Sequence, residues 1–133
     1  LQDLLVSQAR SFIYTTALPE PVVRASLAAL KCATAERREL LRDRVVRLRE
    51  GLHALGIEAR GKDHIVPIVL GKQTMPIASN LLDRGFWVAG IRPPTVPAGA
   101  ERLRITVSAS HSNTQIDGLL EALEAAVQET SHD

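Results

Sequence analysis

The chain has 133 residues, of which 45% are hydrophobic and 23% are charged, so we expect one globular domain large enough to bury a core. Sixteen basic and fifteen acidic side chains leave a formal net charge of +1, which gives no general attraction to nucleic acid or to a membrane surface. One cysteine excludes a disulfide within the chain, and no apolar run approaches the ~20 residues of a membrane span. With no signal-peptide pattern at the start, these features predict a cytoplasmic protein.

The first twenty residues lead into a helix. Residues 12–16 read FIYTT, a run with strand propensity. Pro19 and Pro21 then flank Glu20, and proline is tolerated in the first helical turn, where a backbone N–H has no partner. A carboxylate at this position also suits the positive end of the helix dipole. We therefore expect a short strand followed by a helix.

A helical pattern covers residues 21–55. Its second half carries one apolar stripe at spacings of three and four, formed by Leu41, Val45, Leu48, Leu52 and Leu55. An earlier stripe does not join it smoothly, so we expect a break near residues 33–36. Gly56 is a candidate left-handed cap at the helix end. Six arginines off the stripe favour a solvated face over a nucleic-acid surface: Arg37, Arg38, Arg42, Arg44, Arg47 and Arg49.

Strands are predicted in the rest of the chain. Residues 57–59, 65–70 and 86–89 have strand character, and Pro67 indicates a sheet edge or a bulge. Residues 101–109 give the clearest strand, since Leu, Ile and Val alternate with Arg, Thr and Ser. This period of two predicts one apolar and one polar face.

Two helices lie between and after these strands. Thr74 is a candidate N-cap for a helix over residues 75–84 that Gly85 ends. Its inward residues are predicted to be Ile77, Leu81 and Leu82. Ser112, with Gln115 three residues later, predicts a capping box for a final helix. The order of these helices and strands predicts an α/β protein of the α+β type, in which a long helix precedes a small three- or four-stranded sheet.

Residues 91–97, IRPPTVP, form a stiff and extended loop. Three prolines in five positions fix φ and remove backbone donors, and residues before proline are also held extended. The loop thus holds Arg92 and Thr95 in a rigid frame, which suits binding of a small anion. The alternative is a plain connection whose arginine is only solvated.

Several kinds of catalytic site are not predicted. The four histidines are scattered, and no cysteine or carboxylate stands at ligand spacing from them, so we expect no metal. Cys32 lies within a helical pattern, which favours a buried structural thiol over a nucleophile. The chain has no glycine-rich phosphate loop and no nucleophile elbow.

The remaining candidates form an anion-binding set. Arg104 stands on the polar face of the best strand, and its planar fork suits bidentate binding of a carboxylate. Thr95 and Arg92 would join it if the proline loop folds over that face, whereas Arg102 shares the face without an assigned role.

A second pair of candidates precedes the first long helix. The hydroxyls of Thr15 and Thr16, ahead of the helix start at residues 19–21, are candidates to bind a phosphate. The alternative is that both are ordinary strand residues.

Three segments resemble a known family. Residues 9–19 (ARSFIYTTALP), 91–97 (IRPPTVP) and 102–106 (RLRIT), with Ala109 and His111 beyond them, closely resemble the α-oxoamine synthases, which use pyridoxal phosphate. The likeness extends over essentially the whole chain, and the proline loop is similar to that of the 8-amino-7-oxononanoate synthase branch.

The resemblance implies a fold, a reaction and site residues. The fold is that of the fold-type-I transferases, as homodimers. The reaction condenses L-alanine with a pimeloyl thioester, of coenzyme A or of acyl carrier protein, in biotin synthesis. In the family's pattern the position of Arg104 binds the amino-acid carboxylate, that of Thr95 contacts substrate, and that of Thr15 reaches the cofactor phosphate across the dimer interface.

The sequence departs from the family at the cofactor lysine. The family's lysine lies in a Ser/Thr-x-x-Lys context about thirty residues before the threonine pair, and none of Lys31, Lys62 or Lys72 has that context. The resemblance therefore implies the C-terminal portion of such an enzyme, without catalytic residues of its own and inactive alone.

This reading also predicts how the chain is divided. Residues 1–20 would end the large domain and contact the dimer partner, 21–55 would be connecting helices, and 56–133 would be the small domain. Two alternatives stay open. One is another α-oxoamine synthase with a different amino acid or acyl donor, and the other is a non-catalytic dimerisation or binding module.

Overall fold

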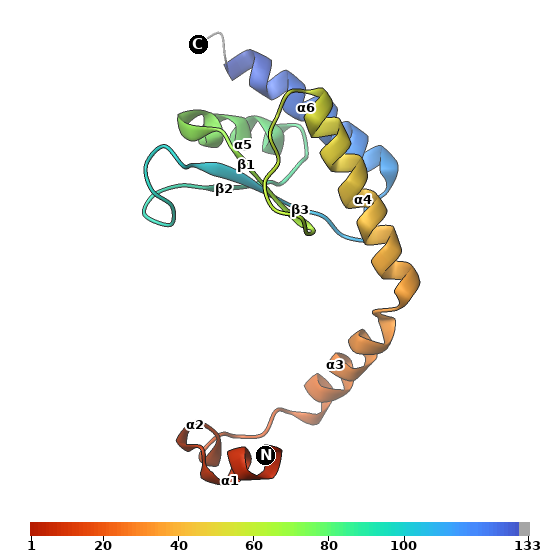
Figure 1. Cartoon of the computed structure of the whole chain (residues 1–133), viewed down its shortest axis with the longest axis vertical. Helices are drawn as coiled ribbons and strands as arrows, with labels where there is room; N and C mark the ends of the chain where they lie inside the picture. The colour runs from red at the N-terminus through yellow and green to blue at the C-terminus, as the bar shows by residue number, and fades with distance from the viewer. Residues whose placement is uncertain (131–133) are drawn as a thin grey trace. The chain divides into compact units, whose positions relative to one another are not determined.

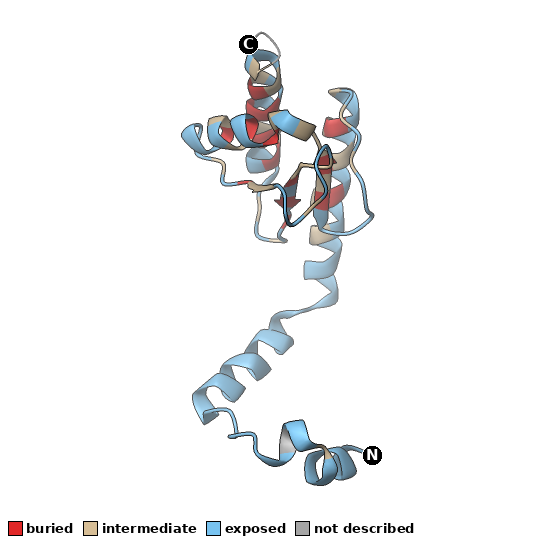
Figure 2. Cartoon of the chain, turned by 90° about the vertical axis from the view of Figure 1, so that its left-hand side faces the viewer, coloured by how far each residue is buried: buried red, intermediate tan, exposed pale blue. Residues whose placement is uncertain are grey.

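The computed structural model describes residues 1–130. They form two units, residues 1–34 and the chain from residue 35 onward (Figure 1). Every residue that this range shows as buried lies in the second unit, between Val45 and Ala126 (Figure 2). The second unit therefore has a hydrophobic core of its own. The three-domain division predicted above stays a prediction.

The first unit is entirely helical. It contains α1 (Gln2–Gln8), α2 (Arg10–Ile13) and α3 (Glu20–Cys32). The strand predicted over residues 12–16 is wrong, because α2 covers its start and no strand lies within residues 1–34 to pair with it. Strand propensity depends on such partners more than on the residues themselves. The helix start is confirmed, with Pro19 as the N-cap of α3.

The second unit begins with α4 (Ala35–Ala54), which confirms the predicted break after α3. The predicted apolar stripe faces the core, with Val45, Leu48 and Leu52 buried. Gly56 follows the helix at φ +72°, as predicted. Its N–H donates to the carbonyl of His53, and the next N–H donates to the carbonyl of Leu52, so the helix ends in a Schellman motif.

Three antiparallel strands form the sheet, which confirms the predicted fold class. They are β1 (Ile65–Val69), β2 (Ala89–Ile91) and β3 (Arg102–Thr106), in the order β1-β3-β2. Two strand predictions need correction. Residues 57–59 contribute only one bridge, from Ala59 to Ile68, and β2 begins only at the last residue of the predicted strand 86–89.

Pro67 fits the edge position predicted for it. β1 is an edge strand, and the carbonyl of Pro67 accepts from the N–H of Arg60, on the side away from β3. Backbone groups of one residue point to the same side of a strand, so the missing N–H of Pro67 also faces the outer edge. The β1–β3 ladder therefore loses no hydrogen bond.

Two further helices complete the unit. A 3₁₀ turn, η1 (Gly71–Gln73), leads into α5 (Thr74–Asp83), and α6 (Asn113–Thr130) ends the fold. The capping box of α6 is confirmed: the N–H of Ser112 donates to Gln115 Oε1 (2.9 Å), and the N–H of Gln115 donates to Ser112 Oγ (3.1 Å).

The predictions for α5 are partly wrong. Thr74 is the first helical residue and not the N-cap, and its fully buried hydroxyl has no hydrogen-bond partner within residues 1–130. Ile77 and Leu81 are buried as predicted, but Leu82 is 57% exposed. The reason is geometric, since residues 81 and 82 lie about 100° apart around the helix, and only one of them can face the sheet.

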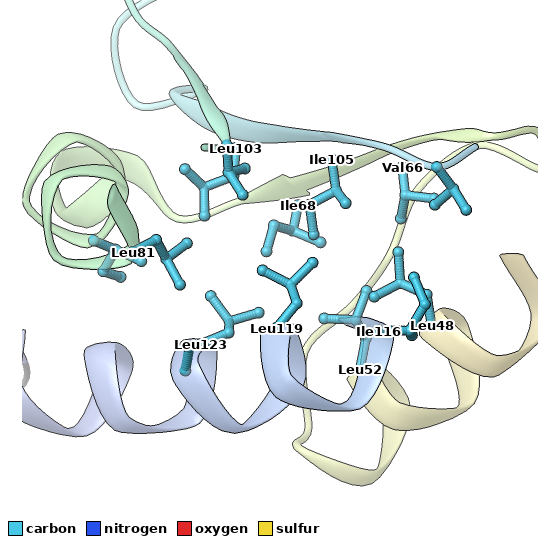
Figure 3. Packing of buried hydrophobic residues seen from close by; sticks show 14 of the residues in the cluster. Leu48, Leu52, Val66, Ile68, Leu81, Leu103, Ile105, Ile116, Leu119 and Leu123 are labelled. Carbon is cyan, nitrogen blue, oxygen red and sulfur yellow. The ribbon is translucent and has the colours of Figure 1, made fainter. Parts of the chain in front are cut away.

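Helices cover one face of the sheet and bury the core against it. Leu103 and Ile105 of β3 and Ile68 of β1 point toward α6, with its Leu119 and Leu123, and Val66 of β1 lies over Leu48 of α4 (Figure 3). Leu48 and Leu52 of α4 close the same cluster. Within residues 35–130 no helix covers the opposite face of the sheet, so it is the face available to ligands.

Three arginines of α4 are not simply solvated, contrary to the prediction. Arg44 donates through Nε to the carbonyl of His111 (2.8 Å) and through a terminal nitrogen to Asn113 Oδ1 (2.6 Å). Arg47 binds both carboxylate oxygens of Asp117, each at 2.7 Å. Arg49 donates to two carbonyls in the segment before β1. These contacts span up to 70 residues of sequence, so periodicity within one helix cannot reveal them.

The Arg47–Asp117 pair predicts a loss of stability in acid. The hydrogen bonds from Arg47 lower the pKa of Asp117 below its ordinary value, so the stabilising contribution exists at neutral pH and disappears as pH falls through that lowered pKa. We expect the urea midpoint to fall on acidification, and Asp117→Asn to reduce that fall. Glu129, whose pKa is lowered by hydrogen bonds from Asn80 and Arg84, should still make the urea midpoint of this variant fall to some extent in acid. If the urea midpoint of Asp117→Asn fell with pH as steeply as that of the unaltered chain, the assignment to Asp117 would be contradicted.

Candidate functional site

The candidate site lies on the open face of the sheet, around β3. Along this strand Leu103 and Ile105 are buried, whereas Arg104 and Thr106 are exposed. The alternation predicted from the sequence is therefore confirmed, and it places the polar side chains opposite the helices.

Arg104 stands between two residues that cannot pair with it. The register sets it opposite Pro67 of β1 and Ala89 of β2, and residues directly opposite each other share a face. A proline ring and a methyl group offer no acceptor, and the exposed guanidinium has no hydrogen bond or ion pair within residues 1–130. Its five donors are thus available to an anion.

Arg102 differs from Arg104 although both lie on the same face. Its Nε donates to the carbonyl of Ala100 at 3.0 Å, and the side chain is partly buried. Arg102 therefore stabilises its own loop, and Arg104 is the arginine of this strand that a ligand can reach.

The proline loop forms a tight turn after β2, so the extended conformation predicted for it is wrong. The Pro93–Pro94 peptide bond is cis, and the N–H of Thr95 donates to the carbonyl of Arg92 at 3.1 Å, as in a type VI turn. The side chains of Arg92 and Thr95 are exposed and make no hydrogen bond with each other or with Arg104 in the described part of the chain. Their assignment to the site stays a prediction.

The threonine pair lies in the first unit, between α2 and α3. Thr15 donates its hydroxyl hydrogen to the carbonyl of Ser11 at 2.6 Å, and Thr16 is exposed. At the start of α3, Pro21 has no N–H, and the N–H groups of residues 22 and 23 donate to the carbonyl of Pro19. The hydroxyl of Thr16 is therefore the group of this segment that a phosphate can reach directly, whereas the N–H groups of residues 22 and 23 are already engaged.

The cysteine and the lysines form no second site within residues 1–130. Cys32 is exposed and not buried as predicted, because α3 buries no residue. Lys31, Lys62 and Lys72 are all exposed. Within residues 1–130, no cluster of three metal-binding side chains occurs, and no helix has the length and apolarity to cross a membrane.

The sequence did not reveal which residues of the adjacent strands lie next to Arg104. Pro67 and Ala89 lie 37 and 15 residues away along the chain, and neither carries a group that points to chemistry. Their importance comes from the strand register, which a single sequence does not contain.

Comparison with known proteins places the chain in a family. The model of the family described as "Aminotransferase class I and II" matches residues 1–123. Proteins named 8-amino-7-oxononanoate synthase are similar: one from Methylococcus capsulatus is 48% identical over 96% of this chain and 34% of its own length, and one from Anaeromyxobacter sp. is 46% identical over 96% and 33%.

A solved structure agrees with these relatives. Sphingomonas wittichii serine palmitoyltransferase superposes with a TM-score of 0.90 at 27% identity, over 98% of this chain and 35% of that one. The chain spans about a third of the length of the curated relatives it matches. From the family match over nearly its whole length, the chain belongs to the class I and II aminotransferase family.

Proposed function

We propose that the chain is the C-terminal part of an 8-amino-7-oxononanoate synthase. The full-length protein would condense L-alanine with a pimeloyl thioester, releasing carbon dioxide and the thiol carrier. The observation that carries the proposal is identity of 46–48% over nearly the whole chain with proteins of that name. The IRPPTVP loop, which resembles the loop of the same branch, also supports the proposal.

Within this function Arg104 binds the amino-acid carboxylate. Its free guanidinium lies between two residues that offer no acceptor, so a carboxylate would meet an unengaged planar fork. A bidentate contact fixes the orientation as well as the position of the amino acid. Thr95 and Arg92, held on the rigid turn after β2, would contact the same substrate.

Thr15 and Thr16 are the residues that would contact the phosphate of pyridoxal phosphate, in the site of a second copy of the protein. The cofactor would supply an electron sink for the bonds broken at the amino-acid carbon. The exposed hydroxyl of Thr16 fits a phosphate directly, whereas that of Thr15 must first leave the carbonyl of Ser11. A homodimer in the cytoplasm is part of this proposal.

The chain alone should not catalyse the reaction. Its three lysines are exposed, and none lies on β3 or in the proline loop. The residue that holds the cofactor would therefore come from the rest of the full-length protein.

A second candidate is a related synthase that takes serine and a longer acyl thioester. The TM-score of 0.90 to a serine palmitoyltransferase favours it, although identity to that protein is 27%.

Turnover by the full-length protein tests both candidates. With pyridoxal phosphate, we expect L-alanine and pimeloyl-coenzyme A or pimeloyl-acyl carrier protein to give 8-amino-7-oxononanoate and carbon dioxide. The 133-residue chain serves as the inactive control. Turnover of serine with palmitoyl-coenzyme A would establish the second candidate instead, and no turnover with either pair would refute both.

A further inference from the structure

A hollow opens beside Arg104 at the end of the sheet. It has a volume of about 260 Å³ and lies between residues 85–88, the end of β3 and the first turns of α6, all within the second unit. Its apolar lining is formed by Phe86, Val88, Ile105, Val107, Ile116 and Leu119. Ile105 and Leu119 face each other from the strand and the helix (Figure 3).

The hollow exists because two strands separate. The N–H of Val107 donates to the carbonyl of His64 on the β1 side, so the N–H and C=O of Thr106 point to the opposite side. There β2 has not yet begun, and no backbone hydrogen bond joins Thr106 to residues 86–88 in the described part of the chain. The gap gives access from the open face of the sheet to the apolar side chains beneath.

The mouth of the hollow lies on the same face as Arg104. Thr106 lines it and follows Arg104 by two residues, which corresponds to about 7 Å along a strand. Trp87 also lines it and is 90% exposed. An indole left in water at the entrance of an apolar hollow is a surface that a bound chain would cover.

His111 and Gln115 contribute hydrogen-bond donors to the polar lining. His111 Nδ1 accepts from the N–H of Ser108 at 3.2 Å, so its free nitrogen is Nε2, which carries the proton in the neutral ring. Gln115 Oε1 accepts from the N–H of Ser112, so its amide NH₂ remains. Both residues line the hollow, and their donors suit a carboxylate.

We propose that this hollow binds a linear acyl chain that ends in a carboxylate. The apolar walls bury the methylenes, and His111 and Gln115 receive the far carboxylate. Taking about 30 Å³ for each heavy-atom group, the share of one water molecule in the liquid, the volume accommodates roughly eight groups, which is enough for the carbons of such a chain but not for all of its oxygens. The choice of a seven-carbon dicarboxylic chain rests on the proposed function, but the hollow itself does not.

The single tryptophan of the chain reports on the site directly. Trp87 is the only one, so its fluorescence can be followed in the 133-residue chain while monomethyl heptanedioate is added. We expect a saturable blue shift as the ester covers the indole. Monomethyl butanedioate, shorter by three methylenes, should bind about sixtyfold more weakly, from about fourfold for each methylene. Equal affinity for the two esters, or no shift with either, would overturn the proposal.

Two variants locate the binding. Thr106→Phe fills the mouth from an exposed strand position and should abolish the shift, whereas Thr106→Val, which keeps the size, should retain it. Circular dichroism checks the fold, and if Thr106→Phe fails to fold, the comparison of the two esters in the unaltered chain decides. Arg104→Ala should also retain the shift, and its loss there would place the ester on Arg104 and overturn the proposal.

These measurements separate the hollow from the synthase assignment. Ester binding without turnover by the full-length protein would refute the proposed function and leave the hollow. Turnover of pimeloyl thioester without ester binding at Trp87 would refute the hollow as a binding site and leave the proposed function.

Discussion

Arg104→Ala in the full-length protein is expected to raise the KM for L-alanine about a hundredfold, which corresponds to ~3 kcal/mol for the loss of a paired, hydrogen-bonded charge. The guanidinium has no partner of its own within residues 1–130, so the loss would be one of ligand binding and not of folding. The KM for the pimeloyl thioester should change little. Steady-state kinetics with each substrate varied in turn measure both constants.

Two further arginine variants sharpen this test. Arg104→Lys keeps the charge but not the planar fork, so its KM for alanine should lie between those of the wild type and Arg104→Ala. Arg60→Ala removes another exposed arginine, outside the three strands, and should leave both constants unchanged. Equal increases in both KM values for Arg104→Ala would remove this residue from the carboxylate role.

Leu103→Ala is expected to lower the free energy of unfolding by about 2–5 kcal/mol, the range for removing a fully buried leucine and leaving a cavity. Leu103 is 0% exposed and lies opposite Ile68 and Gly90 in the middle of the sheet. Urea denaturation followed by circular dichroism measures the change.

Thr106→Ala is the matched control for this substitution. It lies on the same strand but on the open face, and exposed substitutions usually change stability by less than about 0.5 kcal/mol. A loss as large as that of Leu103→Ala would mean that the open face also carries packing. A small loss for Leu103→Ala would show that the core closes around the cavity.

Local patterns predicted much of the second unit. The alternation in β3, the stripe of α4, the cap at Gly56 and the capping box of α6 are confirmed, because each rests on residues close in sequence. The strand predicted over residues 12–16 failed because those residues have no neighbouring strand to pair with. Leu82 was placed inward because propensity and spacing do not tell which face of a helix meets the sheet.

In the candidate site, too, the sequence predicted what depends on nearby residues and did not predict what depends on distant ones. Arg104 was identified from the sequence, because a period of two places it on the polar face of a strand. That its neighbours are Pro67 and Ala89, and that Arg102 is occupied by the carbonyl of Ala100, followed only from the register and the packing.

For this protein the sequence alone determined which residues of β3 alternate, where α4 ends and where α6 begins, and that Arg104 lies on the polar face of its strand, since these depend on spacings of a few residues. Only the tertiary structure decided which arginine is free, which helices bind one another through Arg44 and Arg47, and where the strands separate to open a hollow beside Arg104. Those features depend on pairs of residues far apart in the chain, and such pairs form only when the whole sheet and its helices have closed around one core.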